Sequence, residues 1–247
     1  MRLATICARA GSKRLPGKNT RIVNGWPLWV HTAKQAIDSK QFAFVCVSTD
    51  DEDIARTVRP WFGLGLIVRP PELATDEAGK VPVIRHVLTE AERWTGETFD
   101  HIIDLDVTAP LRTLDDIRGF CAKLDTIEDG GLVSVCKARR SAYFNQVELA
   151  EKDLWGNVDR ARLVKWDDDM VLGGVYLRSQ DAPVTYDMNA SMTGWTRCYL
   201  LAGGDHPVGN NTYIFEMPRE RSWDIDDEFD FQIVEFLMSK QRESVAA

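Results

Sequence analysis

Four cationic side chains lie within one short stretch of the chain, directly after its first apolar run. The stretch reads ARAGSKRLPGKN and spans residues 8–19, with Arg9, Lys13, Arg14 and Lys18 as its cations. Gly11 would let the backbone turn closely, so that Ser12 and its neighbours present N–H groups to phosphate oxygens. The cations would neutralise the remaining phosphate charge. The alternative is a solvated basic turn, and the stretch is not a Walker A loop, because G-x-x-x-x-G-K-[ST] is absent.

A second cluster is acidic and lies near the end of the chain, in DIDDEFD at residues 224–230. Asp224 and Asp226 are separated by one residue at an expected strand-like bend, which points both carboxylates to one side. Mg²⁺ prefers such oxygen ligands and keeps water and phosphate in its other positions. Helix capping by Asp226, Asp227 and Glu228 is the competing interpretation, because acids favour helix N-termini. Together, the basic stretch and the acid pair indicate nucleotidyl transfer.

The overall charge limits the partners that the basic stretch can serve. The formal net charge of the 247 residues is -8, which argues against a nucleic-acid partner and against a membrane-surface partner. A local basic cluster therefore suits a small polyanion. The five cysteines form no C-x-x-C pair, which favours a reducing, cytoplasmic compartment. The N-terminal apolar run is too short for a signal peptide, and no stretch has the length of a bilayer span.

The elements that would position these residues alternate between strand-like and helix-like segments. The pattern predicts strands at 2–8, 42–48, 64–69, 101–106, 131–137 and 212–217. It predicts helices at 27–37, from about 83 to 94, after a Thr113 cap, and beyond the acidic cluster. The last of these would pack through Phe229, Ile233, Phe236 and Leu237. This order predicts an α/β fold with a mostly parallel, doubly wound sheet.

The polar segments 9–19, 49–53, 69–80 and 104–112 all follow predicted strands. Ligands of such sheets bind at the carboxyl ends of the strands, so these segments are expected to form the site. We expect one domain over residues 1–247, interrupted at 139–187, where short strand-like pieces and acidic turns break the rhythm. We interpret 139–187 as an inserted subdomain that contributes to dimerisation and to the sugar site.

Five blocks, in order, resemble the signatures of the acylneuraminate cytidylyltransferases, which make CMP-sialic acids and relatives from CTP. The blocks are ARAGSKRLPGKN, STDDEDIA, RPPELATD, TAPLR and DIDDEFD. The resemblance spans residues 3 to 238 and implies a Rossmann-like three-layer nucleotidyltransferase fold, Mg²⁺ dependence and a homodimer. It implies that the anomeric hydroxyl of a nonulosonic acid attacks the α-phosphorus of CTP and releases pyrophosphate.

The resemblance also implies roles for individual residues. The implied CTP-binding residues are Ala8, Arg9, Gly11, Ser12, Lys13, Arg14, Lys18, Asn19, Arg69, Ala78 and Lys80. Of these, Arg69, Ala78 and Lys80 align with the cytosine pocket, where a Ser is commoner than Lys at position 80. The implied catalytic set is Arg9, Lys18, Asn19, Asp224 and Asp226, with Asp224 and Asp226 as the Mg²⁺ ligands. The implied sugar-site residues are Asp106, Arg112, Tyr186, Asp187 and Asn189.

Two departures bear on the sugar. Asp106 replaces a Gln of the sialic-acid enzymes, and Asp187 lies where an Arg is expected to hold the sugar carboxylate. The blocks IDLDVTAPLR, ARRSAYFNQVE, RSQDAP and YDMNAS look more like the branch that activates legionaminic acid. The sugar carboxylate would then need another cation, for which the candidates are Arg139, Arg140 and Arg178. The open alternatives are N-acetylneuraminate, pseudaminate or an eight-carbon ulosonate as the sugar, and a non-catalytic nucleotide-binding sensor.

Overall fold

The computed structural model describes the chain except for residues 59–63, 153–158, 166–175 and 247. It divides into two compact units. The larger unit, called here the sheet unit, comprises Met1–Val135 and Met188–Ala247. The smaller, called here the inserted unit, is Cys136–Asp187, close to the segment at which the sequence rhythm breaks.

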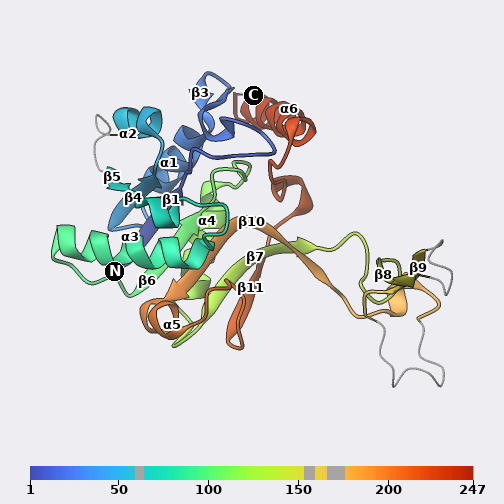
Figure 1. The fold of residues 1–247 in the computed structure, drawn as a ribbon. Helices are drawn as coiled ribbons and strands as arrows, with labels where there is room; N and C mark the ends of the chain where they lie inside the picture. Colours follow the sequence, from blue (N-terminus) through green and yellow to red (C-terminus); the bar gives the residue numbers. More distant parts are fainter. Residues whose placement is uncertain (59–63, 153–158, 166–175, 247) are drawn as a thin grey trace. The chain divides into compact units, whose positions relative to one another are not determined.

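A seven-stranded sheet with the order β11-β7-β10-β6-β1-β4-β5 forms the centre of the sheet unit (Figure 1). Its strands are β1 (Arg2–Cys7), β4 (Phe44–Thr49), β5 (Leu64–Val68), β6 (His101–Leu105), β7 (Gly131–Lys137), β10 (Tyr186–Thr196) and β11 (Thr212–Glu216). The pairs β1–β4, β1–β6, β4–β5 and β7–β11 are parallel, whereas β10 runs antiparallel to β6. The predicted mostly parallel α/β fold is therefore confirmed.

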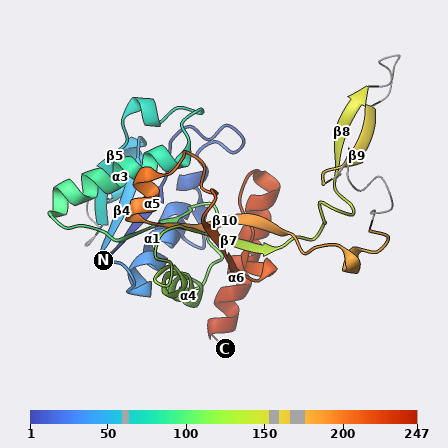
Figure 2. The same cartoon turned by 90° about the horizontal axis from the view of Figure 1, so that it is seen from below.

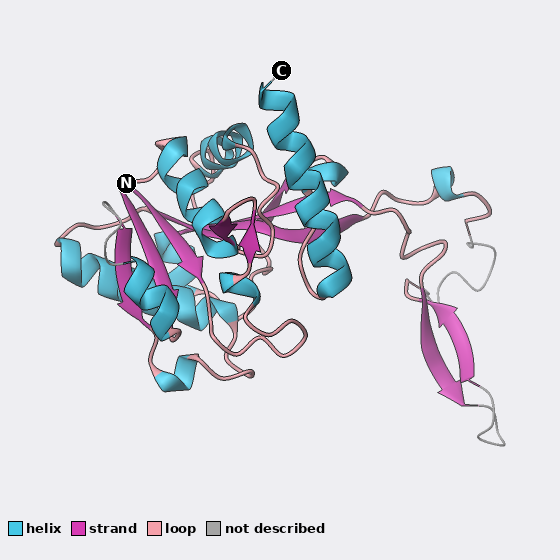
Figure 3. Ribbon diagram, turned by 90° about the horizontal axis from the view of Figure 1, so that it is seen from above, coloured by secondary structure: helices cyan, strands magenta, loops and turns pink. Residues whose placement is uncertain are grey.

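Helices cover both faces of the sheet (Figure 3). They are α1 (Leu28–Ser39), α2 (Glu52–Val58), α3 (Lys80–Thr95), α4 (Leu114–Leu124), α5 (Arg197–Ala202) and α6 (Glu228–Ala246). Alternation along the strands separates two cores: Ala4 and Ile103 pack with α1, α4 and α6, whereas Leu3 and Ile102 pack with α3 and α5. The three-layer arrangement follows from this alternation. Short elements complete the unit: β2 (Ile22–Val23), β3 (Trp26–Pro27) and the 3₁₀ turns Lys18–Thr20, Pro71–Leu73 and Arg219–Arg221.

The predicted apolar face of the last helix is right for Leu237, which packs against the core, and wrong for its two Phe residues. Phe229 and Phe236 are 68% and 59% exposed, whereas Phe231, Val234 and Met238 are buried against the core. The residues at 231, 234 and 238 share one helical face through their i, i+3, i+7 spacing. The helix begins at a cap by Asp227, whose Oδ1 accepts bonds from the backbone N–H groups of Phe229 and Asp230, at 2.9 and 3.0 Å.

Another predicted cap is confirmed. Thr113 and Asp116 form a reciprocal capping box at the start of α4. Strand β10 was not predicted, and it lies between β6 and β7. Close packing on this strand depends on Gly194, where an added Cβ would come within 2.8 Å of the Phe120 ring.

The inserted unit contains an antiparallel hairpin of β8 (Val147–Lys152) and β9 (Asp159–Leu163), visible in Figure 2, and a 3₁₀ turn at Ser179–Asp181. The strand-like piece expected at 171–178 falls mostly outside the described residues. Among the helices that the structure describes, none has the length and apolar composition needed to cross a membrane.

Candidate functional site

The basic loop after β1 is fixed at its base by buried polar contacts. Asn19 is buried, and its Nδ2 donates to the carbonyl of Arg9 at 2.9 Å. The residue with left-handed backbone is Gly17, at φ 65°, rather than Gly11, beside which an added Cβ would meet open space. Lys18 Nζ donates to the carbonyl of Ile225 at 2.9 Å, and so joins this loop to the acidic cluster. The loop and the acidic cluster therefore meet, as a nucleotidyl-transfer site requires.

Two cavities open at the carboxyl ends of the parallel strands. One, of about 360 Å³, is lined by residues including Arg9, Lys18, Asn19, Arg69, Ala78, Lys80, Asp106 and Asp224. The other, of about 350 Å³, is lined by Arg9, Ser12, Lys13, Arg14, Lys18, Asp76 and Asp226. Arg9, Lys18 and Asp76 line both. The two cavities therefore adjoin, the second being dominated by the basic loop.

Acidic side chains hold the cations of the basic loop. Asp76 pairs with Arg9 at 2.8 Å and also with Lys13. These bonds, first the one from Lys13, hold the pKa of the Asp76 carboxyl below its usual value. Arg14 Nη1 lies 2.8 Å from Oδ2 of Asp226. A polyanionic ligand that binds the loop would therefore displace the carboxylates of Asp76 and Asp226 from these cations.

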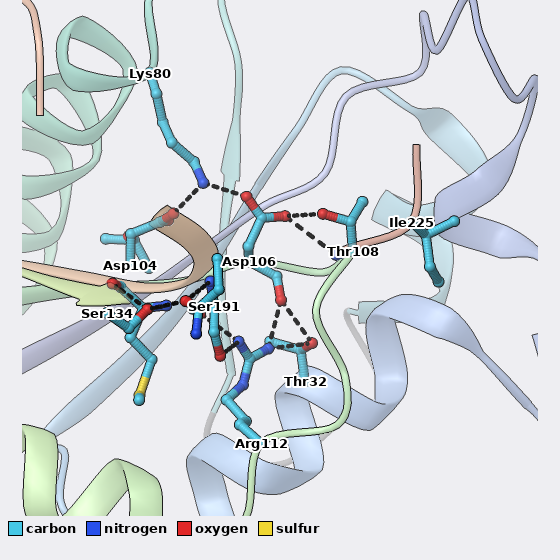
Figure 4. Close-up of polar contacts among 12 residues, drawn as sticks. Thr32, Lys80, Asp104, Asp106, Thr108, Arg112, Ser134, Ser191 and Ile225 are labelled. Carbon is cyan, nitrogen blue, oxygen red and sulfur yellow. Dashed lines mark hydrogen bonds and ion pairs between the residues drawn. The ribbon is translucent and has the colours of Figure 1, made fainter. Parts of the chain in front are cut away.

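The three residues aligned with the cytosine pocket line the first cavity. Arg69 is buried and donates from Nη2 to the carbonyl of Ser48 at 3.1 Å, which holds it against the end of β4. Ala78 precedes α3, and its backbone N–H donates to Thr75 Oγ1 at 3.2 Å. Lys80 is the first residue of α3, and its Nζ lies 2.7 Å from Oδ2 of Asp104 and also contacts Asp106 (Figure 4).

The acid pair differs in its environment. Asp224 Oδ1 is buried without a hydrogen-bond partner, and burial, together with the nearby charge of Asp106, raises the pKa of Asp224. Asp226 is exposed and paired with Arg14. Within the described residues, no group of three or more metal-binding side chains lies together. Two carboxylates still fit Mg²⁺, because this ion takes one or two protein carboxylates and completes its shell with phosphate and water.

Two residues implied for the sugar site are held inside the fold. Arg112 is buried and donates to Gln35 Oε1 at 3.0 Å, Thr32 Oγ1 at 2.8 Å and the carbonyls of Asp106 and Ser191. Figure 4 shows its guanidinium facing Thr32, Ser191 and the Asp106 backbone. Arg112 therefore ties α1 and β10 to the loop after β6, and its contact with sugar stays a prediction.

Asn189 has a similar setting. It is buried and accepts at Oδ1 from Ser134 Oγ, at 2.6 Å, and donates from Nδ2 to Ser222 Oγ, at 2.8 Å. Ser222 precedes the acid pair by two residues, so Asn189 anchors that segment to the sheet. Its contact with sugar likewise stays a prediction.

The remaining residues implied for the sugar belong to the inserted unit. Tyr186, Asp187, Arg139 and Arg140 are exposed there. Arg178 is exposed and pairs with Asp181 at 2.7 Å. Their assignment to the sugar remains untested.

Sequence reasoning missed three side chains that shape the first cavity. Asp76 and Thr108 line it directly, and Asp104 contacts Lys80 from below the surface. A signal for Asp104 was present in IIDLD, where residues 104 and 106 share one side of a strand through the two-residue period. Asp76 had no such signal, because its partners Arg9 and Lys13 are more than 60 residues away in sequence.

A parallel α/β sheet with cation-lined cavities at the carboxyl ends of its strands is characteristic of nucleotide-binding proteins. A family model described as cytidylyltransferase matches residues 3–128. The chain belongs to this cytidylyltransferase family, in agreement with the resemblance found in the sequence.

Individual relatives agree with this membership. The chain is 36% identical, over 97% of its length and 95% of the relative, to post-translational flagellin modification protein B of Campylobacter coli. It is 37% identical, over 96% of its length and 94% of the relative, to CMP-N,N'-diacetyllegionaminic acid synthase of Campylobacter jejuni. A solved structure of CMP:2-keto-3-deoxy-manno-octonic acid synthetase with CTP superposes at TM-score 0.67 and 18% identity, covering 97% of this chain and 99% of that one. At this identity the likeness concerns the fold.

Proposed function

We propose that the chain transfers CMP from CTP to the anomeric hydroxyl of a legionaminate-type nonulosonic acid. The new bond joins the sugar oxygen to the α-phosphorus, the α–β bridging P–O bond breaks, the hydroxyl proton is lost, and pyrophosphate leaves. The observation that carries the proposal is the junction of basic loop and acid pair, where Lys18 bonds the carbonyl of Ile225 between Asp224 and Asp226. Family membership and the name of the Campylobacter jejuni relative support it.

The two adjoining cavities suit the two ends of CTP. The triphosphate would occupy the cavity of the basic loop, where its oxygens replace Asp76 as the partner of Arg9 and Lys13. The cytidine would occupy the cavity lined by Arg69, Ala78 and Lys80. Arg9 and Lys18 line both cavities and Asn19 lines the first, so these three side chains would lie near the α-phosphate that is attacked. Under this division, nine of the eleven implied CTP-binding residues would contact CTP, whereas Gly11 and the buried Ala8 line neither cavity.

Mg²⁺ would be held by Asp224 and Asp226. When bound, it supplies a Lewis acid that neutralises charge developing on the phosphates. Arg14 would then lose its partner Asp226 and become available to the triphosphate. Buried Asp224 would gain a counter-charge for its unpartnered oxygen.

The choice of sugar rests on Asp187 and on the identity of the relatives. An acid cannot pair with the sugar carboxylate, but it accepts bonds from amide N–H groups, and a 5,7-diacylamino sugar has one more than N-acetylneuraminate. Asp106 is expected to contribute less to selectivity for the sugar than its position implied, because both of its oxygens already accept bonds from Thr108 and Lys80. Asp187 is exposed in the free chain, and a bound sugar would have to cover it for this preference to arise. A covered acceptor left without a donor costs about 1–3 kcal/mol, which predicts a preference of roughly ten- to a hundredfold.

The test is pyrophosphate release from CTP and Mg²⁺ with a panel of sugars. We expect N,N'-diacetyllegionaminate to give the highest kcat/KM, above N-acetylneuraminate, pseudaminate and 3-deoxy-octulosonate. Equal or better use of N-acetylneuraminate would refute the sugar assignment and leave cytidylyl transfer intact. No release with any sugar, together with CTP binding, would favour the sensor. CTP should also raise the Tm more than ATP or GTP does, and equal shifts would refute base selectivity.

The proposal also includes a homodimer and a cytoplasmic location. The hairpin of the inserted unit exposes Val147 and Leu149, and apolar side chains of this kind are suited to a homodimer interface. All five cysteines are free thiols in the structure, a state suited to the reducing cytoplasm.

A further inference from the structure

Lys80 lies between two carboxylates at the wall of the first cavity. Its Nζ is 2.7 Å from Oδ2 of Asp104 and forms a second ion pair with Oδ2 of Asp106. The lysine comes from the start of α3, whereas both acids come from the end of β6 and the residue after it. Figure 4 shows the ammonium directed at the two acids. One cation therefore ties a helix to a neighbouring strand end at the site.

The two acids have few acceptor positions left for any other partner. Oδ1 of Asp106 accepts from the backbone N–H of Thr108 at 3.1 Å and from its hydroxyl at 2.9 Å. Oδ1 of Asp104 accepts from Thr5 Oγ1 at 2.7 Å, and the Asp104 side chain is only 1% exposed. Each carboxylate is thus held on one oxygen by the fold and on the other by Lys80.

Lys80, by contrast, keeps access to the cavity. Its side chain is 34% exposed and lines the cavity wall. An ammonium group has three N–H donors. One of them donates to Asp106, whereas Oδ2 of Asp104 is held by the ion pair and accepts no hydrogen bond from the described residues. At least one donor is therefore available to a bound molecule. Asp106 also lines the cavity, but both of its carboxylate oxygens are engaged, so the lysine is the member of the cluster with a hydrogen-bonding group left for a ligand.

The surroundings keep this ammonium charged. Burial alone would lower the pKa of Lys80, but the charges of Asp104 and Asp106 outweigh it and raise the pKa above its usual value. The other titratable side chains lining the cavity are Cys7, Arg9, Lys18, Arg69, Asp76 and Asp224. Cys7 stays a neutral thiol, because burial raises its pKa. The cluster of Lys80, Asp104 and Asp106 carries a net charge of about -1 as a unit.

We propose that Asp104 and Asp106 are positioning residues that fix the ammonium of Lys80 as a donor to the cytidine nucleotide. This deepens the proposed function and rests on it for the identity of the ligand. The chain departs from the sialic-acid pattern at positions 80 and 106, and these two side chains are in direct contact. The proposal therefore accounts for both departures together. A cation facing a base favours acceptor atoms, and cytosine presents two neighbouring acceptors, N3 and O2, where uracil has a donor at N3.

The first test is a double-mutant cycle in the unfolding temperature. Lys80→Met leaves two uncompensated carboxylates and is expected to lower the Tm by about 10 °C. Adding Asp104→Asn restores the net charge of the cluster, so the double variant should unfold at a higher temperature than Lys80→Met alone. Losses of Tm that simply add would show that the side chains do not act as a unit, and would overturn the proposal.

The second test is CTP affinity by calorimetry at pH 7.5 and pH 9.5. Lys80→Met should weaken CTP binding at least tenfold at pH 7.5. Asp104→Asn removes one of the two charges that offset burial, so the pKa of Lys80 falls. Protonated Lys80 is then lost as the pH rises, and CTP affinity should drop several-fold more at pH 9.5. Asp115→Asn, a matched change at a side chain 88% exposed on α4, should match the unaltered chain at both pH values.

The outcomes separate the two proposals. Tight CTP binding that Lys80→Met leaves unchanged would overturn the positioning role and leave the proposed function standing. If Asp104→Asn bound CTP as tightly as Asp115→Asn does at both pH values, the positioning role would also be overturned, and the proposed function would again stand. If the unaltered chain bound no CTP, the proposed function would fail, and the positioning role toward a nucleotide with it, whatever the unfolding cycle gave.

Discussion

The nucleotide cavity and the inserted unit differ in how their polar side chains are held. In the cavity, Lys80 and Arg69 each have a partner from another element of the sheet unit, and Asn19 is held within the basic loop by the carbonyl of Arg9. In the inserted unit, most described side chains are exposed, and Leu149 and Leu177 reach 71% and 88% exposure. The first region is built by the chain itself. The second leaves apolar side chains exposed, which a further partner or a ligand could cover.

The nucleotide cavity is therefore complete within one chain, whereas the hairpin of the inserted unit is expected to need a further partner. A two-stranded hairpin is at best marginally stable without packing on another surface. The cavity depends on no such help, because the core packs on both sides of the sheet behind it. We therefore expect changes in the cavity to abolish chemistry, and changes in the inserted unit to alter sugar use and assembly.

The largest expected effect comes from the acid pair. Asp224→Ala or Asp226→Ala should lower turnover at least about a hundredfold while the fold stays intact, because the lost charge is needed in the transition state. Pyrophosphate release and circular dichroism measure the two properties. The matched control is Asp227→Ala, which removes the cap of α6. It should cost about 1 kcal/mol of stability and leave turnover near normal. If Asp224→Ala and Asp226→Ala kept near-normal turnover while Asp227→Ala lost it, only helix capping would be left as the role of the acid pair.

The next effect tests whether Arg112 belongs to the scaffold. Arg112→Met should leave buried acceptors on Thr32 and Ser191 without a donor, which costs about 3–5 kcal/mol and lowers the Tm by about 10 °C. Arg118→Met, on the exposed face of α4, should change the Tm by no more than about 2 °C. An unchanged Tm with a raised KM for the sugar alone would instead make Arg112 a sugar ligand.

The sequence predicted the strands and the location of the site, because both follow from local patterns. Apolar runs gave β1, β4 and β7, and parallel strands place the loops after them at one edge. Strand β10 was missed, since its alternation is broken by Gly194 and its neighbours in the sheet are distant in sequence. The partners of Asp76 and Asp104 were missed for the same reason. Contacts between distant segments depend on strand order, which one sequence does not contain in any local signal.

A smaller effect is expected for the cations proposed to replace the missing sugar-carboxylate ligand. Of Arg139→Ala, Arg140→Ala and Arg178→Ala, at least one should raise the KM for the sugar about tenfold, because a charged hydrogen bond contributes about 1.5–3 kcal/mol. The KM for CTP should stay unchanged in each. Lys137→Ala, at an exposed cation of the same unit, serves as the control. Sugar KM values that stay unchanged in all three variants would remove these arginines from the sugar site.

The smallest effect on chemistry is expected at the hairpin of the inserted unit. Leu149→Glu places a charge on a side chain that the proposed dimer would bury, and an unpaired buried charge is strongly unfavourable. Light scattering at micromolar concentration should show a dimer for the unaltered chain and a monomer for the variant. CTP affinity should not change, because the cavity lies in the sheet unit. Val68→Glu introduces the same charge at an exposed apolar residue of β5 and should leave the dimer intact. A monomeric unaltered chain, or a dimer that survives Leu149→Glu, would place the interface elsewhere or remove it, and the exposed apolar side chains of the hairpin would then need a different partner.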